Sequence, residues 1–486
     1  MKYLIKLYNT LGRKLDEFRS IADKEVGLYT CGPTVYWYAH IGNMRTYVQE
    51  DILKRVLIHN GYNVKHVMNI TDVGHLVGDS SIGEDKIKLE ARKEQKSAYD
   101  VANFYTGAFV EDLKRLNILL PDIMPKATAH VNEMLSLIKR LDEKGYLYKV
   151  NTGMYFDTSK FKNYGELTGM SFEQLNKNLK AGARVERAAG IKNITDFAVW
   201  RFGKSDEKEM IWDSEWGRGF PGWHIECSAM SMKYLGEHFD IHCGGIDHIP
   251  IHHTNEIAQS EAATGKKFVN YWLHVAFLTV DGKKMAKSLG NVYTVQDLID
   301  KGYSPIGLRY FLMSSHYRND QNFTFEALKN AENTVYSIYS FLASLGDAGD
   351  GSNKLEMPVV GELENYHRRF FEELDNDLNM PNALAVMHSL ISFENKRIEN
   401  KLVSNEEAKK VTEIMLDFDS VLGMDFKSNL KGIELPKEVK ELIDEREKAR
   451  KERNFKRADE IRKIIEERYG ITLEDSERGV IAKKKG

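Results

Sequence analysis

Cysteine is scarce in this sequence. Only three occur among 486 residues, Cys31, Cys227 and Cys243. An odd number of widely spaced cysteines argues against a disulfide framework and indicates a reducing compartment. The thiols are therefore available as ligands.

Long apolar runs are also lacking. No uninterrupted apolar segment reaches the length of a bilayer span, and the opening MKYLIKLYNTLGRK has neither the apolar stretch nor the cleavage site of a secretory signal. We therefore expect a cytoplasmic protein without a membrane partner.

The chain has no excess of positive charge. Its formal net charge is -3, so any contact with RNA must come from local basic patches. Hydrophobic residues make up 42% and charged residues 29%, a composition typical of soluble globular proteins. The length of 486 residues predicts two to four domains.

The first part of the chain has the pattern of a βαβ unit. A short β-prone segment at 26–30 is followed by a Cys-Gly-Pro break, a helical pattern at 41–60 and a second strand pattern at 63–70. Strand patterns return at 239–241 and 272–280, with helices at 222–235 and 252–263. Together they predict an α/β nucleotide-binding fold with a parallel sheet.

The segment between these two groups of strands differs in character. It predicts charged helices at 102–119 and 130–144, a short strand at 153–156 and a loop at 165–190, which we interpret as an insertion. After Pro305 the pattern is one of amphipathic helices, interrupted by a Gly/Asp/Ser-rich linker at 346–353. A compact terminal module with a small hairpin is expected from Leu435 onward.

Two short motifs point to phosphate chemistry. His40-Ile41-Gly42-Asn43 stands at a predicted helix start, where free backbone N–H groups and the helix dipole favour anions. Far downstream, Lys284-Met285-Ala286-Lys287-Ser288 places two lysines and a serine in a polar loop after an apolar strand. Such a loop neutralises a triphosphate and stabilises the charge that develops during phosphoryl or adenylyl transfer.

Each motif alone is weak evidence for a nucleotide site, but the two motifs in this order are stronger evidence. The pair resembles the two signatures of class I aminoacyl-tRNA synthetases, with HIGN for the usual HIGH and KMAKS for KMSKS. The resemblance implies that His40, Asn43, Lys284, Lys287 and Ser288 are catalytic. Asn43 cannot carry an imidazolium charge, and Ala286 lacks a hydroxyl, yet both lysines are present.

A second constellation suits a metal. His252 and Glu256 are four residues apart and share one helix face, and Cys31 and Cys227 supply two thiols. Two thiolates, an imidazole and a carboxylate suit tetrahedral Zn²⁺, which would bind a substrate thiol and reject a serine hydroxyl. Spacing alone leaves open that the cysteines are inert packing residues.

The sequence around these four residues favours the interpretation as a metal site. Residues 31–36, 221–230 and 252–260 are very similar to the cysteinyl-tRNA synthetase family. That resemblance implies one zinc ion on Cys31, Cys227, His252 and Glu256, with His253 as the nearest rival ligand. It also implies a cysteine pocket, whose expected residues are Gly32, Thr34, Thr71 and Trp223.

Residues 239–247 resemble the adenosine-binding turn of the same family, from which we expect Gly245 and Asp247 to contact the nucleoside. With His40, Gly42, Asn43, Lys284 and Lys287 they form the expected ATP site. Cys243, where the family commonly has glycine, is interpreted as a packing residue.

The resemblance extends over nearly the whole chain and implies a Rossmann-like class I catalytic domain with an insertion, a helical bundle and a C-terminal anticodon-binding module. The expected limits are 1–120 and 206–300 for the two catalytic halves, 121–205 for the inserted connective domain, 301–345 for a stem-contact region, 354–430 for the bundle and 431–486 for the module.

The implied reaction joins L-cysteine, activated by ATP with Mg²⁺, to tRNA(Cys), in a protein expected to be a monomer. Two alternatives stay open. A ligase that attaches cysteine to an amino-sugar would share both constellations, although it needs no anticodon module. A catalytically silent RNA-binding paralogue is the other, although it would have no need of the lysines and ligands that this chain retains.

Overall fold

A four-stranded parallel sheet forms the centre of the molecule. The structure is a computed structural model that describes residues 4–73, 85–182, 189–204, 209–347, 356–430, 437–469, 471–476 and 479–484. The sheet has the order β10-β9-β3-β4, and every neighbouring pair is parallel. Its strands are β3 (Glu25–Thr30), β4 (Asn63–Met68), β9 (Phe239–Gly245) and β10 (Val269–Val275). The parallel α/β sheet predicted from the sequence is therefore confirmed.

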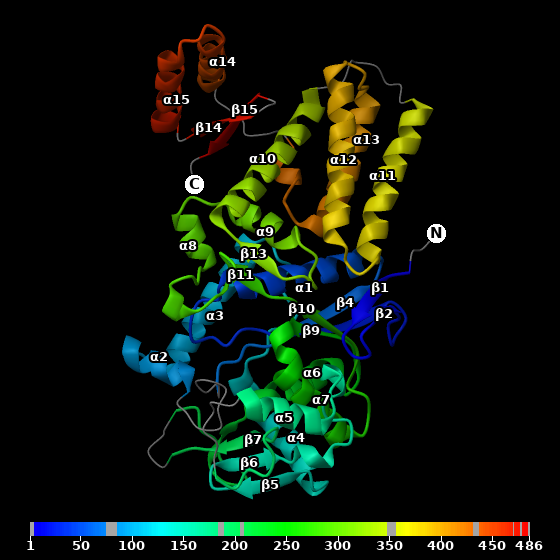
Figure 1. Ribbon diagram of the computed structural model, residues 1–486, viewed down its shortest axis with the longest axis vertical. Helices are drawn as coiled ribbons and strands as arrows, with labels where there is room; N and C mark the ends of the chain where they lie inside the picture. The colour runs from blue at the N-terminus through cyan, green and yellow to red at the C-terminus, as the bar shows by residue number, and fades with distance from the viewer. Residues whose placement is uncertain are drawn as a thin grey trace.

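Helices cover both faces of this sheet. In Figure 1, α1 (Ile41–His59) lies above the strands, whereas α6 (Trp223–Leu235) and α7 (Thr254–Thr264) lie below them. Because both faces are covered, most strand residues are buried, whether apolar or polar; Leu28, Ile241 and His242, for example, are fully buried. A hairpin of β1 (Lys6–Asn9) and β2 (Lys14–Glu17) flanks the β10 edge.

The segment between β4 and β9 lies beside the sheet in its first two helices and below the sheet in its later elements (Figure 1). It contains α2 (Lys86–Glu94), α3 (Ala98–Arg115), α4 (Val131–Glu143) and an antiparallel sheet of β5 (Leu147–Val150), β6 (Gly153–Phe156), β7 (Phe197–Phe202) and β8 (Gly219–Pro221).

The prediction of a loop at 165–190 was wrong for its middle part, which forms helix α5 (Phe172–Gly182). Ser171 and Gln174 cap its start reciprocally: the Gln174 N–H donates to Ser171 Oγ over 3.3 Å, and the Ser171 N–H donates to Gln174 Oε1 over 2.8 Å. Phe172 and Leu175 pack into the interior one turn apart.

The strand expected at 272–280 is two strands, β10 and β11 (Leu278–Val280), because the chain turns at Ala276, whose N–H donates to the Tyr317 carbonyl. β11 pairs with β12 (Lys283–Lys284) and with β13 (Gln321–Phe323), a strand that the helical pattern after Pro305 concealed. The helices of this region are α8 (Val295–Asp300), α9 (Pro305–Met313) and α10 (Phe325–Asp347).

Since α10 runs to Asp347, the start of the predicted linker is helical, and its remainder, 348–353, lies outside the described residues. A helical bundle follows, formed by α11 (Met357–Asp375), α12 (Met380–Glu399) and α13 (Asn405–Leu422) beside α10 (Figure 1). The last elements are α14 (Lys437–Lys451), α15 (Phe455–Tyr469) and the hairpin of β14 (Ile471–Ser476) and β15 (Gly479–Lys484), with a separate small core around Val439, Ile461 and Ile465. No helix in the described ranges has the length and apolar character that a bilayer crossing requires.

A buried charge cluster joins α1 to the bundle. The Arg309 guanidinium on α9 lies 2.5 Å from Asp51 Oδ2 on α1 and donates to the carbonyls of Leu116 and Leu422. Arg55 binds the same Asp51 oxygen at 2.8 Å. Both ion pairs are almost fully buried, so the helical domain is fixed to the helix that starts at the HIGN motif.

Candidate active site

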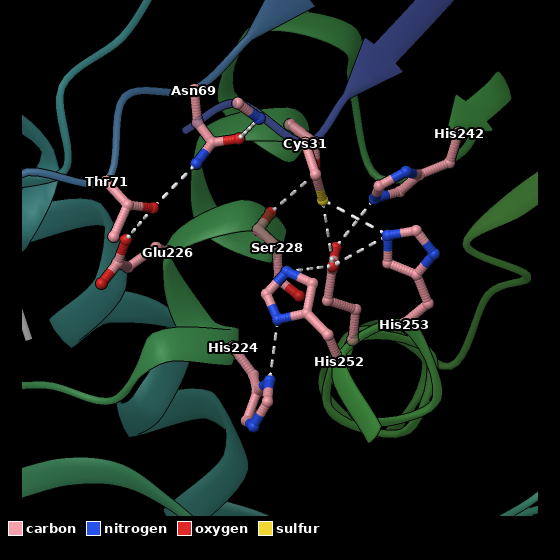
Figure 2. A network of polar contacts seen from close by, with 12 residues as sticks. Cys31, Asn69, Thr71, His224, Glu226, Ser228, His242, His252 and His253 are labelled. Carbon is pink, nitrogen blue, oxygen red and sulfur yellow. Dashed lines mark hydrogen bonds and ion pairs between the residues drawn. The ribbon is translucent and has the colours of Figure 1, made fainter. Parts of the chain in front are cut away.

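The sequence motifs converge at the carboxyl edge of the parallel sheet. Cys31 follows β3, Thr71 follows β4, and Gly245 ends β9. In α/β proteins this edge is where ligands bind, because the loops after neighbouring strands open together there. Residues separated by more than 200 positions thus meet in one place, as Figure 2 shows for Cys31 and His253.

A buried group of metal-binding side chains lies below this edge. We call Cys31, His252, His253 and Glu256 the donor cluster, since their ligand atoms all lie within 4.8 Å of one another. Cys31 Sγ is 3.3 Å from His253 Nε2, and Glu256 Oε1 is 3.0 Å from His252 Nε2. Donor atoms around one tetrahedral zinc ion lie about 3.5 Å apart, so this spacing suits a single metal ion.

Cys227, the fourth ligand expected from the sequence, comes from α6 and is 1% exposed. Its thiol hydrogen-bonds to Cys31 and to His252. The donor cluster itself contains His253, which the sequence analysis had placed as the rival ligand. The geometry therefore groups three of the four predicted ligands with His253, whereas Cys227 lies beside this group and not within it.

The charges in the cluster balance one another. Burial favours the neutral forms, but His242 and His252 lower the pKa of Glu256 to about 2. Against the same burial, Glu256 and then Cys227 raise the pKa of His252 to about 10. Although burial opposes ionisation of Cys227 as well, the Cys31 hydrogen bond and His252 bring its pKa to about 6. Anionic thiolate and carboxylate are thus accessible here, and these are the forms that bind metals.

A ring of further imidazoles supports the cluster. His242 Nε2 lies 3.0 Å from Glu256 Oε2, His224 Nδ1 lies 2.9 Å from His252 Nδ1, and His274 Nε2 lies 2.8 Å from His253 Nδ1 (Figure 2 shows the first two supporting residues). Such outer contacts fix the tautomer and orientation of metal-binding histidines. The sequence analysis missed all three roles. His224 stands inside the quoted 221–230 motif, which was the available signal.

The residues expected to bind the amino acid lie beside the cluster. The half-buried Trp223 begins α6 and stacks on His252, with ring centres 4.3 Å apart. Thr34 and Thr71 pair as an isolated parallel bridge. At Gly32 a Cβ would lie 1.7 Å from the Asn69 carbonyl oxygen, so only glycine permits this approach of the two loops.

A chain of hydrogen bonds orients this pocket (Figure 2). The Gly32 N–H donates to Asn69 Oδ1 over 2.9 Å, and Asn69 Nδ2 donates to Thr71 Oγ1 over 3.0 Å. The Thr71 hydroxyl then donates to Glu226 Oε2 over 3.0 Å. Glu226 is fully buried, and burial followed by the charge of Cys227 raises its pKa well above the usual range. Sequence reasoning had not singled out Asn69 or Glu226 for this pocket.

The HIGN motif forms the capped start of α1. The Asn43 N–H donates to His40 Nδ1 over 3.2 Å, and the His40 N–H donates to Asn43 Oδ1 over 3.1 Å. Because Nδ1 accepts, the neutral His40 ring carries its proton on Nε2, where it can donate to an anion. Asn43 serves as a cap in this position, a task that needs no imidazolium charge.

The KMAKS loop, residues 284–288, contacts the HIGN motif. A Cβ at Gly42 would lie 2.2 Å from Met285 Cε, so the methionine covers this glycine. Asn291 holds the loop from behind, accepting from the Ala286 N–H at 2.9 Å and donating to the Lys284 carbonyl. Lys284 and Ser288 are exposed; Lys287 begins a short 3-10 helix, and its side chain lies outside the described part of the structure.

The remaining predicted nucleotide contacts lie at the end of β9. Gly245 is half-buried and Asp247 is exposed, and a Cβ on Gly245 would lie 2.4 Å from Asp247 Oδ1. Cys243 is 2% exposed within the main core, and its carbonyl accepts from the Cys31 N–H. A packing role, as expected from the sequence, agrees with this position.

Two models of known families match this chain. Residues 17–333 match the model of the tRNA synthetases class I (C) catalytic domain, and residues 369–427 match that of the DALR domain. The first match alone covers more than half of the chain.

Curated relatives match over nearly the full length. A cysteine–tRNA ligase of Treponema denticola is 45% identical, with 97% of this chain and 98% of that protein covered. Cysteine–tRNA ligase 1 of Burkholderia lata is 43% identical (98% and 96% covered), and a cysteine–tRNA ligase of Thermococcus onnurineus is 39% identical (99% of each covered). Because these matches include the C-terminal region, they favour an RNA acceptor over an amino-sugar.

Solved structures support the fold. The Mycobacterium tuberculosis methionyl-tRNA synthetase bound by methionyl-adenylate superposes with a TM-score of 0.59 at 14% identity, covering 84% of this chain and 93% of that one. A leucyl-tRNA synthetase of Agrobacterium radiobacter, in a ternary complex, gives a TM-score of 0.61 at 11% identity, covering 86% and 87%. The Rossmann-like class I architecture expected from the sequence is confirmed.

Proposed function

Since the chain belongs to the class I cysteine–tRNA ligases, we propose that its buried thiol–imidazole–carboxylate site holds one zinc ion that selects cysteine. Cys31, Cys227, His252 and Glu256 are the proposed ligands. The observation that carries the proposal is the convergence of Cys31, His252 and Glu256, whose ligand atoms lie within 4.8 Å of one another in a buried site beside the buried Cys227.

The chemistry of the donor set fits this metal. Zinc held by these residues would supply a Lewis acid, which would lower the pKa of a substrate thiol and favour it over a serine hydroxyl, a poorer ligand. Trp223 covers His252 and closes the apolar side of the pocket. Gly32, Thr34 and Thr71 provide the backbone and hydroxyl groups that orient the amino acid.

Adenylate formation takes place at the contact of the HIGN and KMAKS motifs. The cysteine carboxylate attacks the α-phosphorus of ATP, the bond to the β-phosphate oxygen breaks, and pyrophosphate leaves with its Mg²⁺. His40 donates from Nε2 to the phosphates, Asn43 holds that ring, and Lys284, Lys287 and Ser288 stabilise the charge of the leaving group. Gly42 allows close approach, and Gly245 and Asp247 bind the adenosine.

The second step delivers the product to RNA. A terminal ribose hydroxyl of tRNA(Cys) attacks the cysteinyl carbonyl carbon, AMP leaves, and the hydroxyl proton is released. We assign residues 301–345 to the acceptor stem, 354–430 to the tRNA body and 431–486 to the anticodon. We further propose that the enzyme acts as a monomer in the cytoplasm, in agreement with the reduced state of its three buried cysteines.

Metal analysis of matched variants tests the zinc site. Purified protein is expected to hold one zinc per chain, Cys227→Ser to lose it, and His253→Gln to keep it. Cobalt substitution gives an independent readout, since thiolate ligands produce a characteristic charge-transfer band. Zinc retained by Cys227→Ser but lost by His253→Gln would replace Cys227 by His253 in the ligand set.

Selectivity is tested separately, by amino-acid-dependent pyrophosphate exchange and by charging of tRNA(Cys). Cysteine is expected to exceed serine in kcat/KM by more than the roughly 200-fold that shape alone provides. A zinc-free protein that activates serine equally well would overturn the proposal.

A further inference from the structure

An exposed group of aromatic rings lies just before the HIGN motif. Trp37, Tyr38 and Phe104 have exposed fractions of 38%, 37% and 50%. Their rings meet edge to face: Trp37 to Tyr38 at 5.8 Å and Tyr38 to Phe104 at 6.2 Å between centres. We call these three residues the aromatic shelf. None of them has a role in the site described above.

The shelf is held in place from beneath. Tyr105, only 4% exposed, contacts all three rings, and its hydroxyl donates to Glu94 Oε1 over 2.7 Å. The exposed rings are therefore already fixed before any partner arrives, which lowers the entropic cost of binding.

The shelf forms one wall of a cavity of about 600 Å³ between α3 and the segment after the KMAKS loop. Gly290, Val292 and Thr294 form the opposite wall. Thr294 pairs with His40 as an antiparallel bridge, and the Tyr293 carbonyl accepts from the Ile41 N–H. The cavity thus adjoins both signature motifs, where the acceptor nucleotide has to arrive.

The charge of the cavity selects among possible occupants. Its lining includes the carboxylates of Glu111, Asp112 and Asp297 but only one guanidinium, that of Arg115. Asp297 accepts from the Thr294 N–H and hydroxyl, both at 2.8 Å, and the buried Asp112 accepts from Arg115 at 3.2 Å. Glu111 Oε1 accepts from Lys114 at 2.6 Å, but the Glu111 side chain is 58% exposed and stays open to a partner. With its one guanidinium paired to Asp112, the described lining offers no free cation for a triphosphate or pyrophosphate. It suits groups that carry N–H donors and flat apolar faces.

We propose that the aromatic shelf stacks a base of the unpaired 3′ end of the tRNA and that the exposed carboxylate of Glu111 accepts a hydrogen bond from an exocyclic amino group. Cytosine and adenine, the bases of the universal CCA end, both carry such a group, and carboxylates accept from it. Stacking on exposed aromatic rings is the usual way in which proteins bind single-stranded RNA. The proposal rests on the tRNA acceptor of the proposed function and adds the position of its 3′ end.

The experiment compares Trp37→Ala and Phe104→Ala with the wild type in three assays. Cysteine-dependent pyrophosphate exchange, which needs no tRNA, is expected to stay within twofold. The KM for tRNA(Cys) in charging should rise by roughly 5- to 150-fold, the effect of losing one stacked base. In direct binding by fluorescence anisotropy, the variants should differ from the wild type with intact tRNA but not with tRNA trimmed of its unpaired 3′ nucleotides.

Two further variants sharpen the test. Tyr99→Ala removes another exposed aromatic side chain of α3, 43% exposed, that does not line the cavity, and it should leave all three assays unchanged. Phe104→Trp keeps a stacking surface and should restore most of the lost tRNA affinity.

Several results would overturn the proposal: an unchanged KM for tRNA, a defect that persists with trimmed tRNA, or a parallel loss of pyrophosphate exchange. A concentration-dependent dimer abolished by Trp37→Ala would assign the shelf to a second copy of the chain. These results are separable from failure of the zinc proposal, because wild-type zinc content and cysteine selectivity do not depend on the shelf.

Discussion

At the scale of single residues, Gly42 shows how closely the two signature motifs meet. A Cβ there would lie 2.2 Å from Met285 Cε and 3.0 Å from His40 Nδ1. Gly42→Ala is therefore expected to displace Met285 and lower kcat/KM for ATP by about tenfold or more, while the melting temperature changes little. Gly361→Ala on α11, where a Cβ has open space, is the matched control. Equal kinetics for both variants would contradict this account.

Which site residues could be predicted depended on the sequence around each of them. Cys31, Cys227, His252 and Glu256 were found because they stand in recognisable motifs. His242 and His274 stand in apolar strands, β9 and β10, where a single histidine gives no periodic signal. Their roles follow from the packing of the segment 252–256 against the strands, which brings Glu256 to His242 and His253 to His274. That packing is a tertiary property, which local patterns do not encode.

At the scale of single elements, helix α12 contains a carboxyl group, that of Glu394, whose ionisation costs stability. Burial, and then the charge of Glu407, raise the pKa of Glu394 to about 8 from an ordinary value of 4.5. A raised folded-state pKa means that stability is greatest below about pH 4.5 and is lost as the pH rises to about 8.

Glu394→Gln should abolish that loss. Relative to this variant, the wild type is expected to lose on the order of 2 kcal/mol between pH 5 and 8.5, after allowance for partial solvent screening. Urea unfolding of both proteins at the two pH values measures the difference. Parallel pH profiles would show that Glu394 is ionised at no cost.

Elements bounded by clear turn residues were predictable, and short irregular ones were not. The pattern at 41–60 corresponds to α1, and that at 63–70 to β4. The β13 strand has only three residues and lies between two helices, so its pairing with β11 decides its structure. α5 was missed because Gly165 and Gly169, both at positive φ, suggested a loop that ends just before the helix begins.

At the scale of the whole molecule, the buried charge cluster links catalytic and helical parts. Arg309→Lys keeps the charge but cannot donate to Asp51, Leu116 and Leu422 together. We expect a loss of about 3 kcal/mol in stability, measured as a lower thermal midpoint, because buried acceptors lose their donors. Arg369→Lys, on an exposed site of α11, should be neutral. A wild-type midpoint for Arg309→Lys would show that the cluster does not join the two parts.

Helix α1 is engaged at two places along its length. Its first turn holds His40 and Asn43, and eight residues later Asp51 holds Arg309 and Arg55. Inserting a single residue between these points would turn one end by about 100° relative to the other. Either the HIGN motif or the buried charge cluster could then keep its orientation, but not both. The part of α1 between Asn43 and Asp51 is therefore expected to tolerate substitutions but not insertions or deletions.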